Sequence, residues 1–213
     1  MKPPAQVRQQ SRRRLAFVAL GSNLGESRQN ILAAFHRLKA LSDEPLRESS
    51  LWQTTPEACP PGSPPFVNAV VGLIPRPEET PESLLTKLQA IEKEFGRRPK
   101  QVINEPRPLD LDLICFHAEI RASKTLTLPH PRAHRRRFVL QPLSELSPDL
   151  VLPGQTASVS RLLAELPPDR DMFRISAPGD RPATGPGISR SSQSAGRRRE
   201  GTRASSTRRG SPI

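Results

Sequence analysis

The sequence predicts an α+β domain with a mainly antiparallel sheet and helices packed on its face. Two patterns support this class: short apolar or β-branched runs, and stretches in which apolar residues recur every three or four positions. Prolines and glycines separate the segments. In chain order they are β-α-β-β-α-β, followed by a possible small hairpin at 119–128 and by loops and short helices up to Leu166.

Four segments have the character of strands. Residues 15–20 form a continuous apolar run, which fits a buried central strand. Residues 46–54 and the β-branched stretch 66–74 follow, separated by a proline-rich loop. Residues 109–116 alternate leucine with aspartate before an apolar end, which is the pattern of a strand with two different faces.

Two helices lie between these strands. The second should begin at Thr80 as N-cap, with Pro81 in the first helical position, and should end near Gly96. The first follows Gly25 and has an apolar stripe at i, i+4 and i+7, with Leu32 beside it, formed by Ile31, Phe35 and Leu38. This element order is ferredoxin-like, and it implies no function by itself because many unrelated proteins share it.

The positive charge is concentrated at the two ends of the chain. Residues 1–14 and 176–213 carry +5 and +6 of the net +12, which leaves +1 for residues 15–175. We therefore predict a flexible basic arm at 1–14, one folded domain at 15–175, and a disordered tail rich in Arg, Ser, Gly and Pro at 176–213. Contact with nucleic acid is expected only through these basic ends.

The cysteine content and hydropathy indicate a cytoplasmic chain. Cys59 and Cys115 are the only cysteines, and two thiols in a chain of this size are typical of a reducing compartment. No apolar run approaches the roughly 20 residues that a membrane span needs. The arginines at 12–14 precede an apolar run that is too short for an export signal.

The sharpest chemical feature is the aspartate pair in the last predicted strand. Asp110 and Asp112 should project together from one face, roughly 7 Å apart at Cα. Two ionised carboxylates this close repel each other unless a cation intervenes. Mg²⁺ suits the position, because it binds a few carboxylate oxygens together with substrate phosphates. The alternative is a solvated acidic face on an edge strand, although the basic loop at 97–107 favours a phosphate site.

Four collinear segments resemble one enzyme family. Residues 106–113, Pro-Arg-Pro-Leu-Asp-Leu-Asp-Leu, resemble the signature of the 6-hydroxymethyl-7,8-dihydropterin pyrophosphokinases. The resemblance implies a ferredoxin-like monomer that transfers pyrophosphate from Mg-ATP to the hydroxymethyl group of 6-hydroxymethyl-7,8-dihydropterin, releasing AMP, in folate biosynthesis. The other segments that carry it are residues 19–25, residues 66–70, and residues 126–131 with 138–143.

The resemblance also implies a role for each site residue. Two Mg²⁺ ions would be held by Asp110 and Asp112, and ATP would be the co-substrate. Arg97 and Arg107 would neutralise charge on the transferred group. The residues that would seat the nucleotide are Gln89, Glu92, Thr127, His130 and Arg136. The residues that would line the pterin pocket are Thr54, Phe66, Asn68 and Phe138. Without the resemblance, each has an ordinary interpretation as a core phenylalanine, a loop histidine or a surface charge.

The chain departs from the family pattern just before its signature. Asn104 and Glu105 stand where the family has glycine, often preceded by tryptophan and a basic residue. Glu105 adds negative charge beside the proposed metal site and removes the backbone freedom of glycine. Slow turnover by a degenerate family member is therefore one alternative. The others are a nucleic-acid-binding module, disfavoured because aromatics are only 4% of residues, and another Mg-dependent phosphotransfer enzyme.

Overall fold

The computed structural model describes residues 15–56, 59–98 and 105–175. The predicted arm at 1–14 and tail at 176–213 lie outside these ranges. By its internal contacts the chain divides into two units, Met1–Gly179 and Asp180–Ile213, and the second lies wholly outside the described residues.

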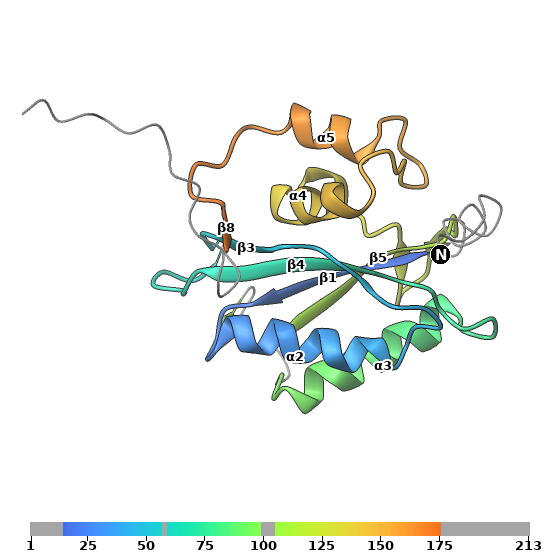
Figure 1. Ribbon diagram of the computed structural model, residues 1–213, viewed down its shortest axis with the longest axis horizontal. Coiled ribbons are helices and arrows are strands. Elements are labelled where there is room, and N and C mark those ends of the chain that lie inside the picture. The colour runs from blue at the N-terminus through green and yellow to red at the C-terminus, as the bar shows by residue number, and fades with distance from the viewer. Residues whose placement is uncertain (1–14, 57–58, 99–104, 176–213) are drawn as a thin grey trace, which may run out of the picture. The chain divides into compact units, whose positions relative to one another are not determined.

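One antiparallel sheet organises the first unit (Figure 1). Its strand order is β5-β1-β4-β3-β8, and the short β2 also pairs with β4. The chain order is β1, α2, β2, β3, β4, α3, β5, which confirms the predicted β-α-β-β-α-β order when β2 and β3 together are taken as the predicted strand at 46–54. The bounds are β1 Ala16–Ser22, β2 Arg47–Glu48, β3 Leu51–Thr54, β4 Phe66–Leu73, β5 Asp110–Phe116 and β8 Phe173–Ile175.

Helices cover both faces of this sheet (Figure 1). Helices α2 (Ser27–Lys39) and α3 (Pro81–Glu94) lie on one face, as predicted for this class. The C-terminal additions place α4 (Arg137–Leu146) and α5 (Val159–Glu165) on the other. The smaller elements are the hairpin β6 Arg121–Ala122 with β7 Thr127–Leu128 and the 3-10 turn η1 Ala133–Arg135. Among the described residues, no helix is both long and apolar enough to span a membrane.

The predicted strand at 46–54 is interrupted, which corrects the expectation of one continuous strand. The break falls between β2 and β3, at Ser49 and Ser50. Ser49 Oγ accepts a hydrogen bond from Val70 N–H at 2.9 Å, while Ser49 N–H donates to the Val70 carbonyl at 3.0 Å. A side chain that takes over a strand–strand hydrogen bond competes with the regular ladder, and the strand divides there.

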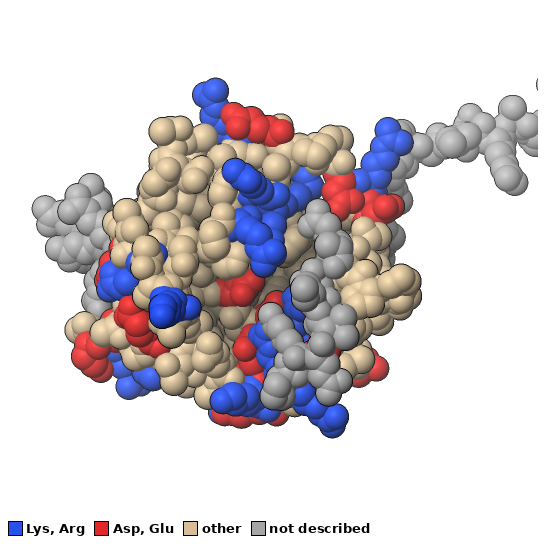
Figure 2. All heavy atoms as spheres, turned by 180° about the vertical axis from the view of Figure 1, so that it is seen from behind, with Lys and Arg blue, Asp and Glu red and all other residues tan. Residues whose placement is uncertain are grey.

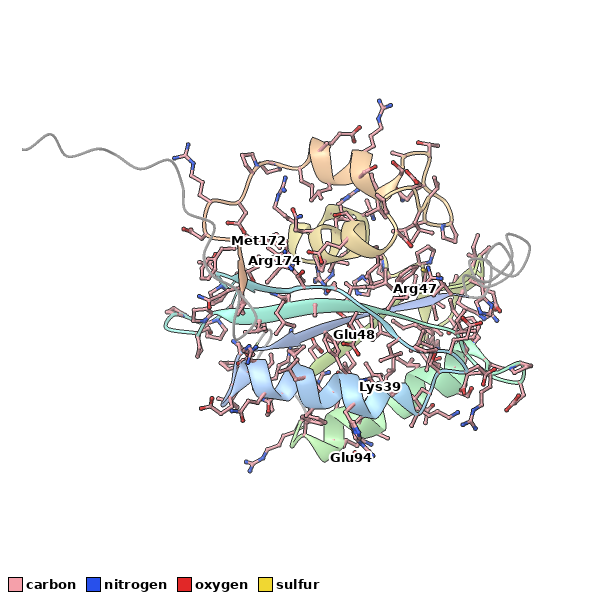
Figure 3. All side chains as sticks on the ribbon, in the orientation of Figure 1. Lys39, Arg47, Glu48, Glu94, Met172 and Arg174 are labelled. Carbon is pink, nitrogen blue, oxygen red and sulfur yellow. The ribbon has the colours of Figure 1, made fainter. Side chains whose placement is uncertain are left out.

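Buried side chains from both helix layers pack against the sheet. The layer under α2 and α3 includes Leu20, Leu38 and Leu88, and the layer under α4 and α5 includes Phe17 and Leu140. The exposed side of α2 carries two ion pairs. Lys39 pairs with Glu48 at 3.6 Å, and both residues are labelled in Figure 3. Arg37 pairs with Glu94 at 2.7 Å. Such exposed pairs contribute at most about 1 kcal/mol each, so burial dominates the stability of this layer.

Replacing Leu88 by Ala should lower the free energy of unfolding by about 2–5 kcal/mol, because its side chain is fully buried and leaves a cavity. Leu32→Ala is the matched control. Leu32 lies on α2 next to the apolar stripe but is 42% exposed, so we expect a change within about 0.5 kcal/mol. Urea denaturation of both variants checks this, and equal losses would contradict the described packing.

Candidate active site

The two aspartates lie side by side on β5, facing away from the leucines between and around them. Leu109, Leu111 and Leu113 are at most 4% exposed, whereas the side chains of Asp110 and Asp112 are 16% and 39% exposed. The expected alternation of faces is therefore present. On the neighbouring strand β1, the partners of the two aspartates are Gly21 and Ala19. These small residues leave space above the sheet beside both carboxylates.

Asp110 is held by two guanidinium groups. Arg97 Nη1 lies 2.6 Å from Asp110 Oδ1, and Arg107 Nη2 lies 2.7 Å from Asp110 Oδ2. Distances this short are typical of charge-assisted hydrogen bonds. Arg97 and Arg107 are the two ends of the basic loop at 97–107, called the arginine loop below, so this loop contacts Asp110 from both ends.

Asp112 has weaker cationic neighbours. His130 Nε2 and Arg136 Nη1 lie 3.9 and 3.8 Å from its Oδ2. Burial of the carboxyl group raises the pKa of Asp112, and the charge of Asp110 raises it further. Burial lowers the pKa of His130, with Asp112 opposing that shift. Asp112 therefore occupies a position where additional positive charge would be stabilising.

The end of α3 positions Arg97. Gly96 has φ +85°, and its N–H donates to the Lys93 carbonyl at 3.0 Å, while Arg97 N–H donates to the Glu92 carbonyl at 3.0 Å. This pair of bonds is the Schellman motif, which glycine permits because it adopts positive φ readily. The predicted helix end at Gly96 is therefore present, and it turns Arg97 back toward β5.

Glu92 supports the aspartate strand from behind. Its side chain is 6% exposed, and Oε1 accepts a hydrogen bond from Leu111 N–H at 2.7 Å. The same oxygen pairs with Arg97 Nη1. Glu92 thus has two partners. One is the backbone of Leu111, which lies between the two aspartates, and the other is Arg97, which pairs with Asp110. The other end of α3 has the predicted cap, where Thr80 and Ser83 exchange hydrogen bonds.

A pocket of about 450 Å³ opens beside the aspartates. In the view of Figure 2, basic side chains gather beside a hollow in which acidic atoms are visible. Asn68 Nδ2 donates to Thr54 Oγ1 at 2.8 Å on its wall. The residues predicted for the site that line the pocket are Thr54, Phe66, Asn68, Arg107, Asp110, Asp112, Arg136 and Phe138.

Each phenylalanine of the pocket faces an arginine. The Arg107 guanidinium carbon lies 5.5 Å from the centre of the Phe66 ring, and that of Arg136 lies 5.4 Å from the Phe138 ring. Both distances fit cation–π contacts. The pocket therefore combines two aromatic faces with cationic groups immediately above them.

The remaining predicted residues do not line the pocket. Arg97 and His130 contact its aspartates without lining it, and Glu92 is buried behind β5. Gln89 on α3 and Thr127 on β7 are exposed and do not line it. Of the departures from the family pattern, Asn104 lies outside the described residues.

The arginines at 132–137 lie in two different environments. Arg132, Arg135 and Arg136 line the pocket, and the first two were not singled out as site residues from the sequence. Arg137 instead donates to the carbonyls at the end of α5, to Leu166 at 2.6 Å and to Pro167 at 2.9 Å. Only the three-dimensional arrangement separates these neighbours, because the sequence shows the same residue type at all four positions.

Helix α4 is fixed to the sheet next to the pocket. Glu145 on α4 accepts hydrogen bonds from Trp52 Nε1 and Ser50 N–H, both at 2.7 Å. Trp52 neighbours the pocket residue Thr54 on β3. These bonds hold the helix that carries Phe138 against the strand that carries Thr54.

The two cysteines should differ sharply in reactivity. Burial raises the pKa of the Cys115 thiol to about 12, and this side chain is 1% exposed, whereas Cys59 lines the pocket. Because the thiolate is the reactive form, a thiol reagent at about pH 8 should titrate one thiol in the folded chain and both in urea. A ligand that fills the pocket should slow the labelling of Cys59. Rapid labelling of a folded Cys59→Ser variant would contradict this expectation.

One family model and several known proteins resemble this chain. A family model described as 7,8-dihydro-6-hydroxymethylpterin-pyrophosphokinase (HPPK) matches residues 17–148. The 2-amino-4-hydroxy-6-hydroxymethyldihydropteridine pyrophosphokinase of Haemophilus influenzae is 38% identical over 151 residues, which cover 71% of this chain and 89% of that protein. The Pseudomonas aeruginosa protein of the same name is 40% identical over 137 residues, 64% of this chain and 83% of its own length.

Longer proteins contain a similar segment. The folic acid synthesis protein fol1 of Pneumocystis carinii is 38% identical over 144 residues, 68% of this chain but only 19% of that protein, so this chain spans about a fifth of it. Among solved structures, wild-type Plasmodium falciparum HPPK-DHPS has a TM-score of 0.55 at 14% identity, over 71% of this chain and 44% of that one. At this identity the likeness shows the shared fold.

The family-model match covers more than half of the chain, and the two bacterial relatives match over most of their own length. These similarities agree with the motif resemblance at residues 106–113 and favour it over a nucleic-acid-binding module or an unrelated phosphotransfer enzyme. The chain belongs to the 7,8-dihydro-6-hydroxymethylpterin-pyrophosphokinase family.

Proposed function

We propose that this ATP-dependent pyrophosphokinase of folate biosynthesis works in the pocket beside β5, where it moves pyrophosphate from Mg-ATP to the hydroxymethyl group of 6-hydroxymethyl-7,8-dihydropterin. One observation carries the proposal. Asp110 and Asp112 line a pocket in which aromatic rings and an amide lie directly beside arginines. A flat heterocycle and a polyphosphate require these two environments next to each other.

Two Mg²⁺ ions would be held by Asp110 and Asp112. The residues fit this ion, because both carboxylates project from one face of β5 and the pKa of Asp112 is raised by burial and by its acidic neighbour. The described residues contain no group of three or more His, Cys, Asp or Glu ligands, and Mg²⁺ commonly uses one or two carboxylates with substrate phosphates. When bound, the ions supply charge neutralisation for the phosphoryl group.

The pterin would bind against Phe66 and Phe138, with Thr54 and Asn68 at its polar edge. Aromatic faces suit stacking of a flat ring, and an amide side chain both donates and accepts hydrogen bonds. Asn68 is 4% exposed and oriented by its bond to Thr54. This orientation supports recognition of one edge of the heterocycle.

The nucleotide would occupy the cationic side of the pocket. His130 and Arg136 adjoin Asp112 and would contact phosphates, while Gln89 and Thr127 would help seat the nucleotide. Glu92 would act on the same side by supporting Arg97 and the backbone of Leu111. Arg132 adds a cation, because its guanidinium has no hydrogen bond or ion pair to any residue that the structure describes.

In the reaction, the hydroxyl oxygen of the pterin attacks the β-phosphorus of ATP, and the hydroxyl proton passes to solvent. The bond from that phosphorus to the α–β bridging oxygen breaks, and AMP leaves. Arg97 and Arg107 neutralise charge on the transferred group, and the pocket walls hold the two substrates in line. Positioning and electrostatics supply most of the rate enhancement in transfers of this kind.

The test is AMP release from ATP and Mg²⁺, with and without 6-hydroxymethyl-7,8-dihydropterin. We expect AMP to form only when both the pterin and Mg²⁺ are present. AMP release that is indifferent to the pterin would refute the proposed acceptor, and release that persists with excess chelator would refute the metal assignment.

We also propose that the enzyme acts as a cytoplasmic monomer. Both cysteines are thiols rather than a disulfide, which is typical of a reducing compartment. Sedimentation of the active enzyme should give the mass of one chain, 23.6 kDa. A dimer at assay concentrations would contradict this part of the proposal.

A further inference from the structure

A buried asparagine at the end of β1 connects the two loops that flank the pocket. Asn23 directly follows β1 and is 2% exposed. Its position before α2 suggests a helix cap, yet the N-cap of that helix is Glu26, which makes no side-chain capping bond. The side chain of Asn23 is used for long-range contacts instead.

The first contact is with the arginine loop. Arg107 N–H donates to Asn23 Oδ1 at 2.9 Å, and Asn23 N–H donates to the Arg107 carbonyl at 3.1 Å. Pro106 and Pro108 flank Arg107 and have no N–H. Arg107 is therefore the one backbone donor in this tripeptide, and Asn23 binds it.

The second contact is with the proline-rich loop before β4. Asn23 Nδ2 donates to the Pro64 carbonyl at 3.2 Å. Phe66, the first residue of β4, lies two positions further along the chain. One amide group therefore holds the backbone of Arg107 and the backbone next to Phe66, whose side chains face each other at 5.5 Å.

A second asparagine secures only one of these loops. Asn30 Nδ2 donates to the Pro108 carbonyl at 3.1 Å and to the Leu24 carbonyl at 3.2 Å. It has no hydrogen bond to residues 60–65 in the part of the chain that the structure describes. Asn23 is thus the residue that links the arginine loop to the aromatic wall.

We propose that Asn23 is a positioning residue that fixes the distance between the Arg107 guanidinium and the Phe66 ring. This role rests on the proposed function, and it gives the oxygen and the nitrogen of the Asn23 side-chain amide separate tasks. The Oδ1 atom orients Arg107 for the transfer step. The Nδ2 atom holds the Pro64 segment and thereby the aromatic face offered to the heterocycle.

Two substitutions separate these tasks. Asn23→Ala removes both side-chain bonds, and we expect kcat to fall about tenfold and the KM for the pterin to rise about tenfold, since each lost bond is worth roughly a factor of ten at most. Asn23→Asp keeps an oxygen that accepts from Arg107 N–H but places an acceptor against the Pro64 carbonyl. We expect this variant to recover kcat to within about threefold of wild type while the raised pterin KM remains.

Ser49→Ala is the control for a lost buried hydrogen bond. Ser49 is 8% exposed and binds Val70 N–H at 2.9 Å, but it does not line the pocket. We expect the Ser49→Ala variant to have a lower Tm than wild type, while its kcat and its KM values for ATP and the pterin stay within about twofold. Direct binding of 6-hydroxymethyl-7,8-dihydropterin, followed through the single tryptophan, Trp52, gives a readout that is independent of turnover.

The outcomes are distinct. Kinetic constants of Asn23→Ala that match wild type, or equal losses of kcat and pterin affinity in both Asn23 variants, would overturn the proposal. If the alanine variant does not fold, the aspartate variant decides alone, because only a positioning role predicts weak pterin binding with retained kcat. Wild-type enzyme that releases no AMP with the pterin would instead refute the proposed function.

Discussion

Replacing Asp112 by Asn should slow pterin-dependent AMP release about a thousandfold. The substitution keeps the shape of the side chain but removes the charge that would bind Mg²⁺ at the phosphates. A bound metal ion contributes several kcal/mol of transition-state stabilisation, and about 4 kcal/mol corresponds to that factor. Steady-state kinetics with saturating ATP and pterin measure the effect. Activity within tenfold of wild type would remove Asp112 from the metal site.

The same variant should be at least as stable as wild type at neutral pH. The pKa of Asp112 is raised in the folded state by burial and by Asp110, so its ionised form opposes folding once the pH exceeds the pKa of the unfolded chain. Asparagine has no such charge. We expect Tm at pH 7 to be equal or higher in Asp112→Asn, and the difference to vanish below about pH 3.9, where the aspartate is protonated in both states. A large loss of Tm would indicate misfolding instead.

Arg107→Ala should lower kcat by about a hundred- to a thousandfold, the usual effect of losing one group that stabilises transition-state charge. In this structure Arg107 both pairs with Asp110 at 2.7 Å and lies over the Phe66 ring. Arg107→Lys should recover only part of the loss, because an ammonium group cannot reproduce the planar stack and the directed hydrogen bonds of a guanidinium.

A matched arginine far from the pocket provides the control. Arg161 on α5 pairs with Glu165 at 3.2 Å, and its side chain is 75% exposed. Arg161→Ala should leave kcat within twofold, since exposed ion pairs contribute little. If both alanine variants lost activity equally, the effect would follow net charge, and the specific role of Arg107 would be refuted.

The central fold could be predicted because its signals are local. The alternation at 109–113 and the Thr80–Pro81 helix start depend on neighbouring residues alone, and both appear as expected. Strand β8 was not predicted: three residues are too few to show a pattern, and their pairing with β3 depends on a partner more than 100 positions away. In a helix, an apolar residue next to the buried stripe need not be buried itself. Leu32 lies beside the stripe of α2 and is exposed.

The site could be predicted where side-chain chemistry is distinctive. Paired aspartates and a basic loop are visible in any reading of the sequence, and the structure brings them together. The role of Asn23 was not visible, because its partners Pro64 and Arg107 are 41 and 84 positions away and it bonds only their backbone atoms. Backbone partners leave no trace in residue type, so such contacts emerge only from coordinates.

Strand β8 has a consequence for any shortened version of the enzyme. It covers the outer edge of β3 by pairing Leu51 with Ile175 and Gln53 with Phe173. Arg174 lies on the same strand (Figure 3), and a charge on an edge strand discourages further strand addition. A fragment ending at Leu166 would keep every pocket residue but expose the unpaired backbone of β3. Such a fragment should be prone to self-association through strand addition, even with its chemistry intact.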